Sequence, residues 1–175
     1  MGLAWGLALR SWMAVLALGF GDWPVFTVRG TFAAVVAPAV VMGAVLGWAE
    51  HARRTGGKGW RWAALAPLLL VLPPAVLLPG FIETLLDTGE GSGAIGVALV
   101  GVAGGYAVSG RGPRWARALA GVAPVAVSGA MLWFLFVDGM DPDPARRWFG
   151  AALLGVLLVL LVAACSLPHR RPPPP

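Results

Sequence analysis

The chain has 175 residues, of which 58% are hydrophobic and only 12% are charged, and its formal net charge at pH 7 is +5. Soluble domains carry about 25% charged residues, so this composition excludes an ordinary soluble domain and predicts an all-α integral membrane protein. The basic residues lie in short loops beside apolar segments, so the excess of positive charge indicates membrane topology and not nucleic-acid binding. Arginine outnumbers lysine by twelve to one, which is typical of a GC-rich bacterial genome.

Six apolar segments follow one another along the chain, each close to the ~20 residues that a membrane-spanning helix needs. They cover residues 2–21, 30–49, 62–80, 92–109, 116–137 and 148–167. We therefore expect a polytopic protein with about six transmembrane helices in one compact bundle over 1–168, and an Arg/Pro-rich tail over 169–175. The fourth segment is short and glycine-rich, and the first contains Arg10, so five spans are the alternative.

The first segment also has features of a cleavable signal peptide, because Arg10 precedes an apolar run. A signal peptide ends in a small-x-small cleavage site, and here Phe20 and the sequence Asp22-Trp23-Pro24 intervene. We therefore expect the first segment to remain as an uncleaved span.

The charges between the apolar segments alternate in sign along the chain. Nine of the thirteen basic residues fall on one side of the predicted membrane, namely Arg53, Arg54, Lys58, Arg61, Arg111, Arg114, Arg117, Arg170 and Arg171. The opposite loops hold the acidic residues Asp22, Glu83, Asp87, Glu90, Asp138, Asp141 and Asp143. Short loops follow the positive-inside rule, which places the basic side and both termini in the cytoplasm. The sequence thus predicts a multi-pass protein of the cytoplasmic (plasma) membrane, the inner membrane of a bacterium, with an even number of spans.

Small residues and prolines mark where these helices would pack and bend. Helices in lipid associate where small residues let their backbones approach, which Gly43 and Gly47 would do in the second segment, and Gly101 and Gly105 in the fourth. Packing within the bundle is the first interpretation of these pairs, and self-association is the alternative. Pro73-Pro74 falls inside the third segment and should break its helix.

Arg10 is the clearest candidate for a functional polar residue. A cation in the hydrocarbon core costs at least ~3 kcal/mol, so it normally pairs, faces water or binds an anion. The competing interpretation is that Arg10, with only nine residues before it, extends to the cytoplasmic interface.

Other polar candidates are fewer and weaker. Glu83 and Asp87 are spaced i, i+4 and would share one helix face, where they could bind a cation, although a solvated acidic face is the simpler interpretation. Tyr106 lies near the inner end of the fourth segment and is expected to form a hydrogen bond. The aspartates over 138–143 could ligate a hard cation, but an acidic outer loop is the default.

No catalytic constellation, nucleotide-binding loop or metal motif is recognisable, so we expect no catalytic residues, no metal and no cofactor. The leading hypothesis is an accessory, scaffold or assembly subunit without enzymatic activity, acting through lipid and through other membrane proteins or itself. The alternative is a small transporter or channel, with Arg10 and the Pro73-Pro74 break at its pathway.

Overall fold

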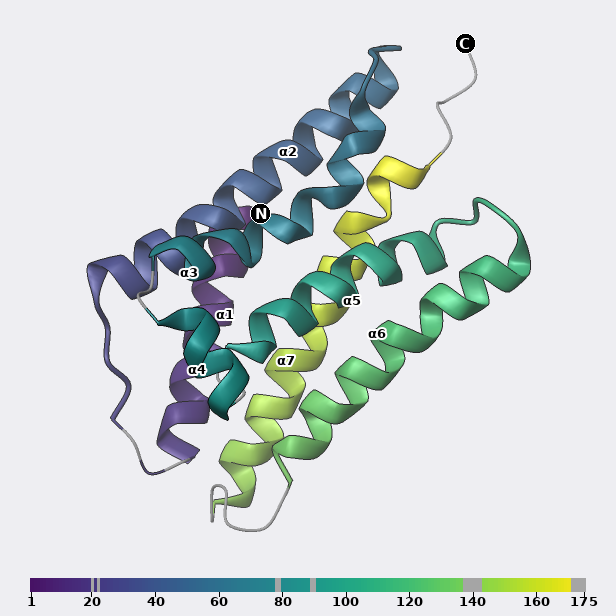
Figure 1. Ribbon diagram of the computed structural model, residues 1–175. Coiled ribbons are helices and arrows are strands. Elements are labelled where there is room, and N and C mark those ends of the chain that lie inside the picture. Colours follow the sequence, from purple (N-terminus) through teal and green to yellow (C-terminus); the bar gives the residue numbers. More distant parts are fainter. Residues whose placement is uncertain (20, 22, 78–79, 89–90, 137–142, 171–175) are drawn as a thin grey trace.

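The computed structural model describes the chain except for residues 20, 22, 78–79, 89–90, 137–142 and 171–175 (Figure 1). All regular elements of the described part are helical, which confirms the predicted all-helical class. In chain order they are α1 (Gly2–Gly19), the π-helix η1 (Val28–Val36), α2 (Ala37–Arg54), the 3₁₀ helix η2 (Trp60–Leu70), α3 (Leu72–Leu77), α4 (Phe81–Thr88), α5 (Ser92–Val108), α6 (Arg114–Phe134), α7 (Pro144–Cys165) and the 3₁₀ turn η3 (Leu167–His169).

Four helical stretches of the described chain are long and apolar enough to cross a membrane. They are Gly2–Gly19, Val28–Arg54, Arg114–Phe134 and Pro144–His169. These helices support a multi-pass membrane protein, and they correspond to the first, second, fifth and sixth segments expected from the sequence. The second stretch is continuous because η1 leads directly into α2. Pro38 lies at this junction, where it has no N–H to donate to the preceding turn.

The third segment differs from its prediction, since no single helix covers 62–80. Residues 60–70 form a 3₁₀ helix that contains Pro67, and the chain turns at Val71 before the six-residue α3 begins. Proline lacks the N–H that an α-helix interior requires, so Pro67 weakens the α-helix there. Pro73 and Pro74 lie in the first turn of α3, the position that tolerates proline best, and thus mark the start of a new helix.

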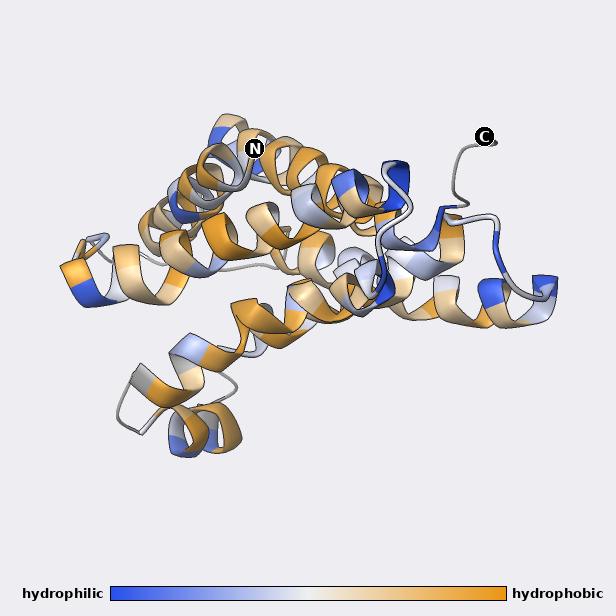
Figure 2. Cartoon of the chain, turned by 90° about the horizontal axis from the view of Figure 1, so that it is seen from above, coloured by the Kyte–Doolittle hydropathy of each residue, from blue (hydrophilic) through white to orange (hydrophobic). Residues whose placement is uncertain are grey.

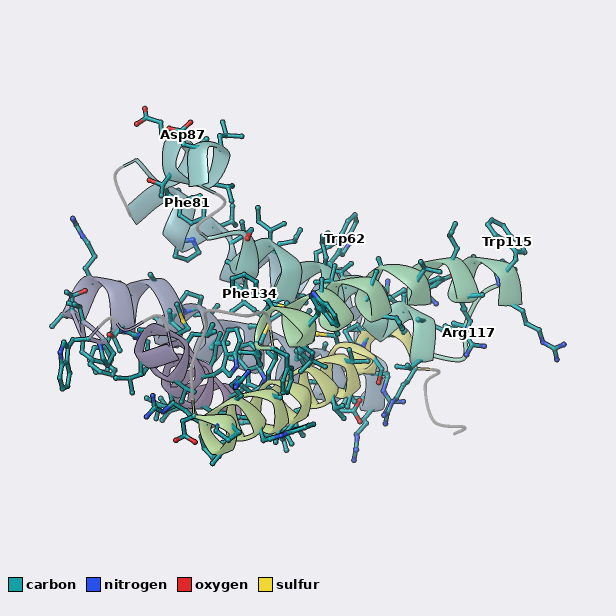
Figure 3. All side chains as sticks on the ribbon, turned by 90° about the horizontal axis from the view of Figure 1, so that it is seen from below. Trp62, Phe81, Asp87, Trp115, Arg117 and Phe134 are labelled. Atoms are coloured by element: carbon teal, nitrogen blue, oxygen red, sulfur yellow. The ribbon has the colours of Figure 1, made fainter. Side chains whose placement is uncertain are left out.

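The fourth segment is a regular helix, α5, whose 17 residues rise about 26 Å. It follows α4, and the two helices are bent by 92° relative to each other. If this bent pair forms one crossing, the described chain has five candidate spans instead of four. Figure 3 shows α4 standing away from the remaining helices, with Asp87 pointing away from them.

The core lies between α1, α2, η2, α5 and α7, and it is built from close helix approach and buried indoles. Ala39 of α2 is fully buried against α1, where a Cβ on Gly6 would lie 2.8 Å from the Ala39 side chain. The indole Nε1 of Trp5 donates a hydrogen bond of 2.9 Å to the carbonyl oxygen of Leu157, which ties α1 to α7. Leu154, the most deeply buried large side chain of α7, packs in the same cluster.

At the edge of the bundle lies α6. It packs mainly along α5 and only weakly against α7, and Pro124 is its single buried residue. In the most apolar 18-residue stretch of α6, 6% of the residues are buried. The corresponding stretches of η1–α2 and α7–η3 are 39% and 44% buried. An entire apolar helix therefore presents most of its circumference outside the bundle (Figure 1).

Candidate functional site

Arg10, in the middle of α1, is held by the segment that follows its own helix. Its Nε donates to the hydroxyl oxygen of Thr31 at 3.3 Å, and Nη2 donates to the carbonyl oxygen of Val25 at 2.5 Å. Its guanidinium carbon lies 4.5 Å from the ring centroid of Phe26, a cation–π contact. The cation is thus stabilised by a hydroxyl, a backbone dipole and an aromatic face. Neither of the interpretations derived from the sequence included this arrangement.

The Pro73-Pro74 break lies near the same region. Both α1 and α3 contact η1, the π-helix that carries the Arg10 partner Thr31. A π-helical stretch is rare and often marks a functional position in a helix. The π-helix η1 therefore lies between Arg10 of α1 and the proline-containing helix α3.

Glu83 and Asp87 both lie on α4 and are exposed, as expected for an acidic face. Among the elements of the described chain, α4 has its main contact with α3 (Figure 3). No group of three or more potential metal ligands occurs among the described residues. Of the aspartates over 138–143, Asp138 and Asp141 lie outside the described residues, and the Asp143 carboxylate accepts a hydrogen bond of 2.9 Å from the backbone N–H of Ala145 at the start of α7.

The four glycines singled out from the sequence have different surroundings. A Cβ on Gly43 would lie 2.8 Å from the backbone of Gly2, and one on Gly101 would lie 2.9 Å from the ring of Pro67. A Cβ on Gly105 would lie 2.5 Å from the carbonyl oxygen of Cys165. Gly47, one turn beyond Gly43, has no such neighbour within 4 Å. Three of these glycines therefore lie at close contacts between helices, and Gly47 faces open space.

Tyr106 lies at the end of the bundle where the basic loops meet. Its ring packs edge-to-face on His169, with 5.6 Å between the ring centroids. Its hydroxyl lies directly against Gly112, where a Cβ would collide with it. The φ of Gly112, +82°, also favours glycine at this position. An open pocket of about 430 Å³ occurs here, lined by Arg61, Tyr106, Arg111, Gly112, Pro168 and His169.

Two guanidinium groups of this pocket share one aromatic neighbour. The guanidinium carbons of Arg61 and Arg111 lie 5.5 and 5.9 Å from the centroid of the buried Trp60 indole. Ion pairs in the described chain join Glu50 to Arg53 and Arg54, and none involves a pocket arginine. The pocket is therefore positively charged, and no described carboxylate lines it.

Sequence reasoning predicted that these basic loops share one side of the membrane, but it did not predict the pocket. Figure 2 shows hydrophilic residues gathered at the end of the molecule nearest the C-terminus. The pocket joins the start of η2, the loop after α5 and the turn η3, three places far apart in the sequence. The only signal in the sequence was the shared sign of the loop charges.

Comparison with known proteins gives no match: no family model, no curated protein and no solved structure is significantly similar to this chain.

Proposed function

We propose that this protein is a non-enzymatic accessory subunit of the cytoplasmic membrane that binds another membrane protein along α6. The observation that carries the proposal is the exposure of α6, with Pro124 as its only buried residue. Its outward side chains include the large residues Trp115, Trp133 and Phe134. Aromatic side chains contribute the largest contact areas at protein interfaces, so this face suits a helix of a partner.

In this proposal the chain crosses the membrane six times, with its basic end in the cytoplasm. The third crossing is η2 followed by α3, and the 11 residues of η2 alone rise about 22 Å. The fourth crossing is α5, which rises about 26 Å and is accommodated by modest thinning of the bilayer. The positive-inside rule supports the orientation, because the ends of η2, α5 and η3 bring basic residues together at one end.

Site-specific photocrosslinking in intact cells tests the proposed role of α6. Val125 of α6 and Val159 of α7 are comparably exposed, at 74% and 68%, so they form a matched pair for insertion of p-benzoylphenylalanine. We expect a discrete protein adduct from Val125 that is absent from Val159. The mass of the adduct distinguishes a second copy of this chain from another protein. If Val125 gave only lipid adducts, or the same products as Val159, the proposal would be refuted.

A small transporter or channel is the second candidate, and one specific observation favours it. Arg10 binds a backbone carbonyl outside any helix, at Val25, and α3 contacts η1 next to it. Interrupted helices that free backbone groups near a buried charge form the substrate sites of many transporters. This candidate requires water to reach Arg10, which the accessory role does not.

A further inference from the structure

The pocket lined by Arg61, Tyr106, Arg111 and His169 combines features that select an anion. It holds two arginines, and no described carboxylate neutralises them. Glu50, an acid at the end of α2, is already bound by Arg53 and Arg54 at 2.7 and 2.6 Å. An anion entering the pocket would therefore meet unpaired positive charge instead of displacing an existing partner.

The two arginines also share an aromatic neighbour. Both guanidinium groups lie near the indole of Trp60, which is itself buried against Ala52 and Ala63. Cation–π contacts restrict long side chains that would otherwise lose entropy on binding. The shared indole therefore brings the two guanidinium groups to the same part of the pocket, where both can contact one ligand.

The remaining lining residues favour a phosphate group over a simple halide. Guanidinium groups present forked N–H donors whose spacing matches two oxygens of a phosphate. The Tyr106 hydroxyl, which lies against the Gly112 backbone, and the His169 ring add polar groups to the lining. A volume of about 430 Å³ accepts a phosphate together with a small polar substituent such as glycerol.

We infer that this pocket binds the phosphate group of an anionic phospholipid headgroup or of a small soluble phosphate ester. The pocket lies at the helix ends, where η2 begins and α5 ends, which is the level of lipid headgroups when those segments cross the bilayer. The lipid headgroup as ligand rests on the proposed crossings by η2 and α5, whereas neither ligand requires the partner surface on α6.

Native mass spectrometry of the full chain, released from neutral detergent micelles, tests the inference. Dioleoylphosphatidylglycerol and dioleoylphosphatidylcholine are offered at equal concentrations, and glycerol 3-phosphate is offered separately. Retention of phosphatidylglycerol alone identifies a lipid headgroup, and retention of glycerol 3-phosphate as well identifies a general phosphate-ester site. If the chain retained neither anion above the phosphatidylcholine level, the inference would be wrong.

Charge-matched variants separate the pocket from the general basic surface. Arg61→Gln with Arg111→Gln should weaken phosphatidylglycerol binding at least tenfold, because both bidentate donors are lost. Lys58→Gln with Arg114→Gln removes the same charge from exposed positions at the same end and should change binding less than threefold. Equal losses in the two double variants would show nonspecific attraction and overturn the inference.

A further variant guards against misfolding of the glutamine double mutant. Arg61→Lys with Arg111→Lys keeps both charges but removes the forked donors, so we expect an intermediate loss of about threefold to tenfold. Wild-type affinity in this variant would refute the bidentate geometry. Thermal unfolding of each variant, followed by circular dichroism, shows whether the fold is retained.

Discussion

Replacing Gly105 by alanine should separate α5 from the end of α7. The added Cβ would lie 2.5 Å from the carbonyl oxygen and 2.8 Å from the Cβ of Cys165, whereas ordinary van der Waals contact begins at 3.4 Å. The backbone of one helix must therefore move by about 0.9 Å, since a carbonyl cannot rotate away as a flexible side chain can. Overpacking of this kind costs about 1–3 kcal/mol.

The control for this variant is Gly47→Ala in α2, where a Cβ meets nothing within 4 Å. Each substitution gains up to ~1 kcal/mol of helix propensity, because alanine is the better helix former. The clash is thus the only difference between the two variants, so Gly105→Ala should be about 1–3 kcal/mol less stable than Gly47→Ala. At about 2–4 °C per kcal/mol, its melting temperature should be about 2–12 °C lower.

The single cysteine of the chain provides the assay. Cys165 is 1% exposed, so a thiol-reactive fluorophore labels it only when the surrounding structure opens. Melting of the purified protein in micelles is followed by this labelling, and circular dichroism separates global unfolding from local opening at Cys165. If Gly105→Ala melted at or above the temperature of Gly47→Ala, the close approach of α5 to Cys165 would be refuted.

Two further predictions follow from the proposed topology and from Arg10, and both use single cysteines in a Cys165→Ser background. Cysteines at Lys58 and Asp87, which are both exposed, should react with an impermeant thiol reagent from opposite sides of the membrane. Reaction from the same side would show that η2 and α3 do not cross the membrane and would remove one span from the proposed topology. A cysteine at position 10 should react much more slowly than one at position 58, because Phe26 and Val25 cover the Arg10 side chain. Equally fast reaction would show that water reaches this position, as the transporter candidate requires.

The sequence was sufficient for the long helices, because twenty apolar residues between charged loops leave few alternatives to a helix in lipid. It predicted the start of α1 and of α5 correctly. It could not predict η1 or the 3₁₀ form of η2, because these depend on how a helix interrupted by proline is supported by its neighbours. Prolines indicated where the third segment would break, but not that α3 would turn aside to contact η1.

The candidate residues were identified less completely than the helices. Arg10 stood out because a charge inside an apolar run is costly, yet the sequence did not pair it with Val25 in the following loop or with Thr31 at the start of the second predicted span. The basic pocket was missed because contacts between residues near 61, 106–112 and 168–169 are properties of the assembled bundle. Gly47 shows that a spacing alone can mislead. Its spacing from Gly43 matches a packing motif, but a Cβ on Gly47 would have no neighbour within 4 Å.

The hydrogen bond from Trp5 to Leu157 joins residues 152 positions apart, and this separation orders events during synthesis. At about 5–20 residues per second, a ribosome needs about 8 to 30 seconds between the two residues. In the proposed topology, α1 resides in the bilayer throughout that interval without α7, its final neighbour. Thr31 and Val25, by contrast, emerge within seconds of Arg10 and can stabilise its charge at once. The first helix is therefore secured locally at an early stage, and the last helix completes the bundle.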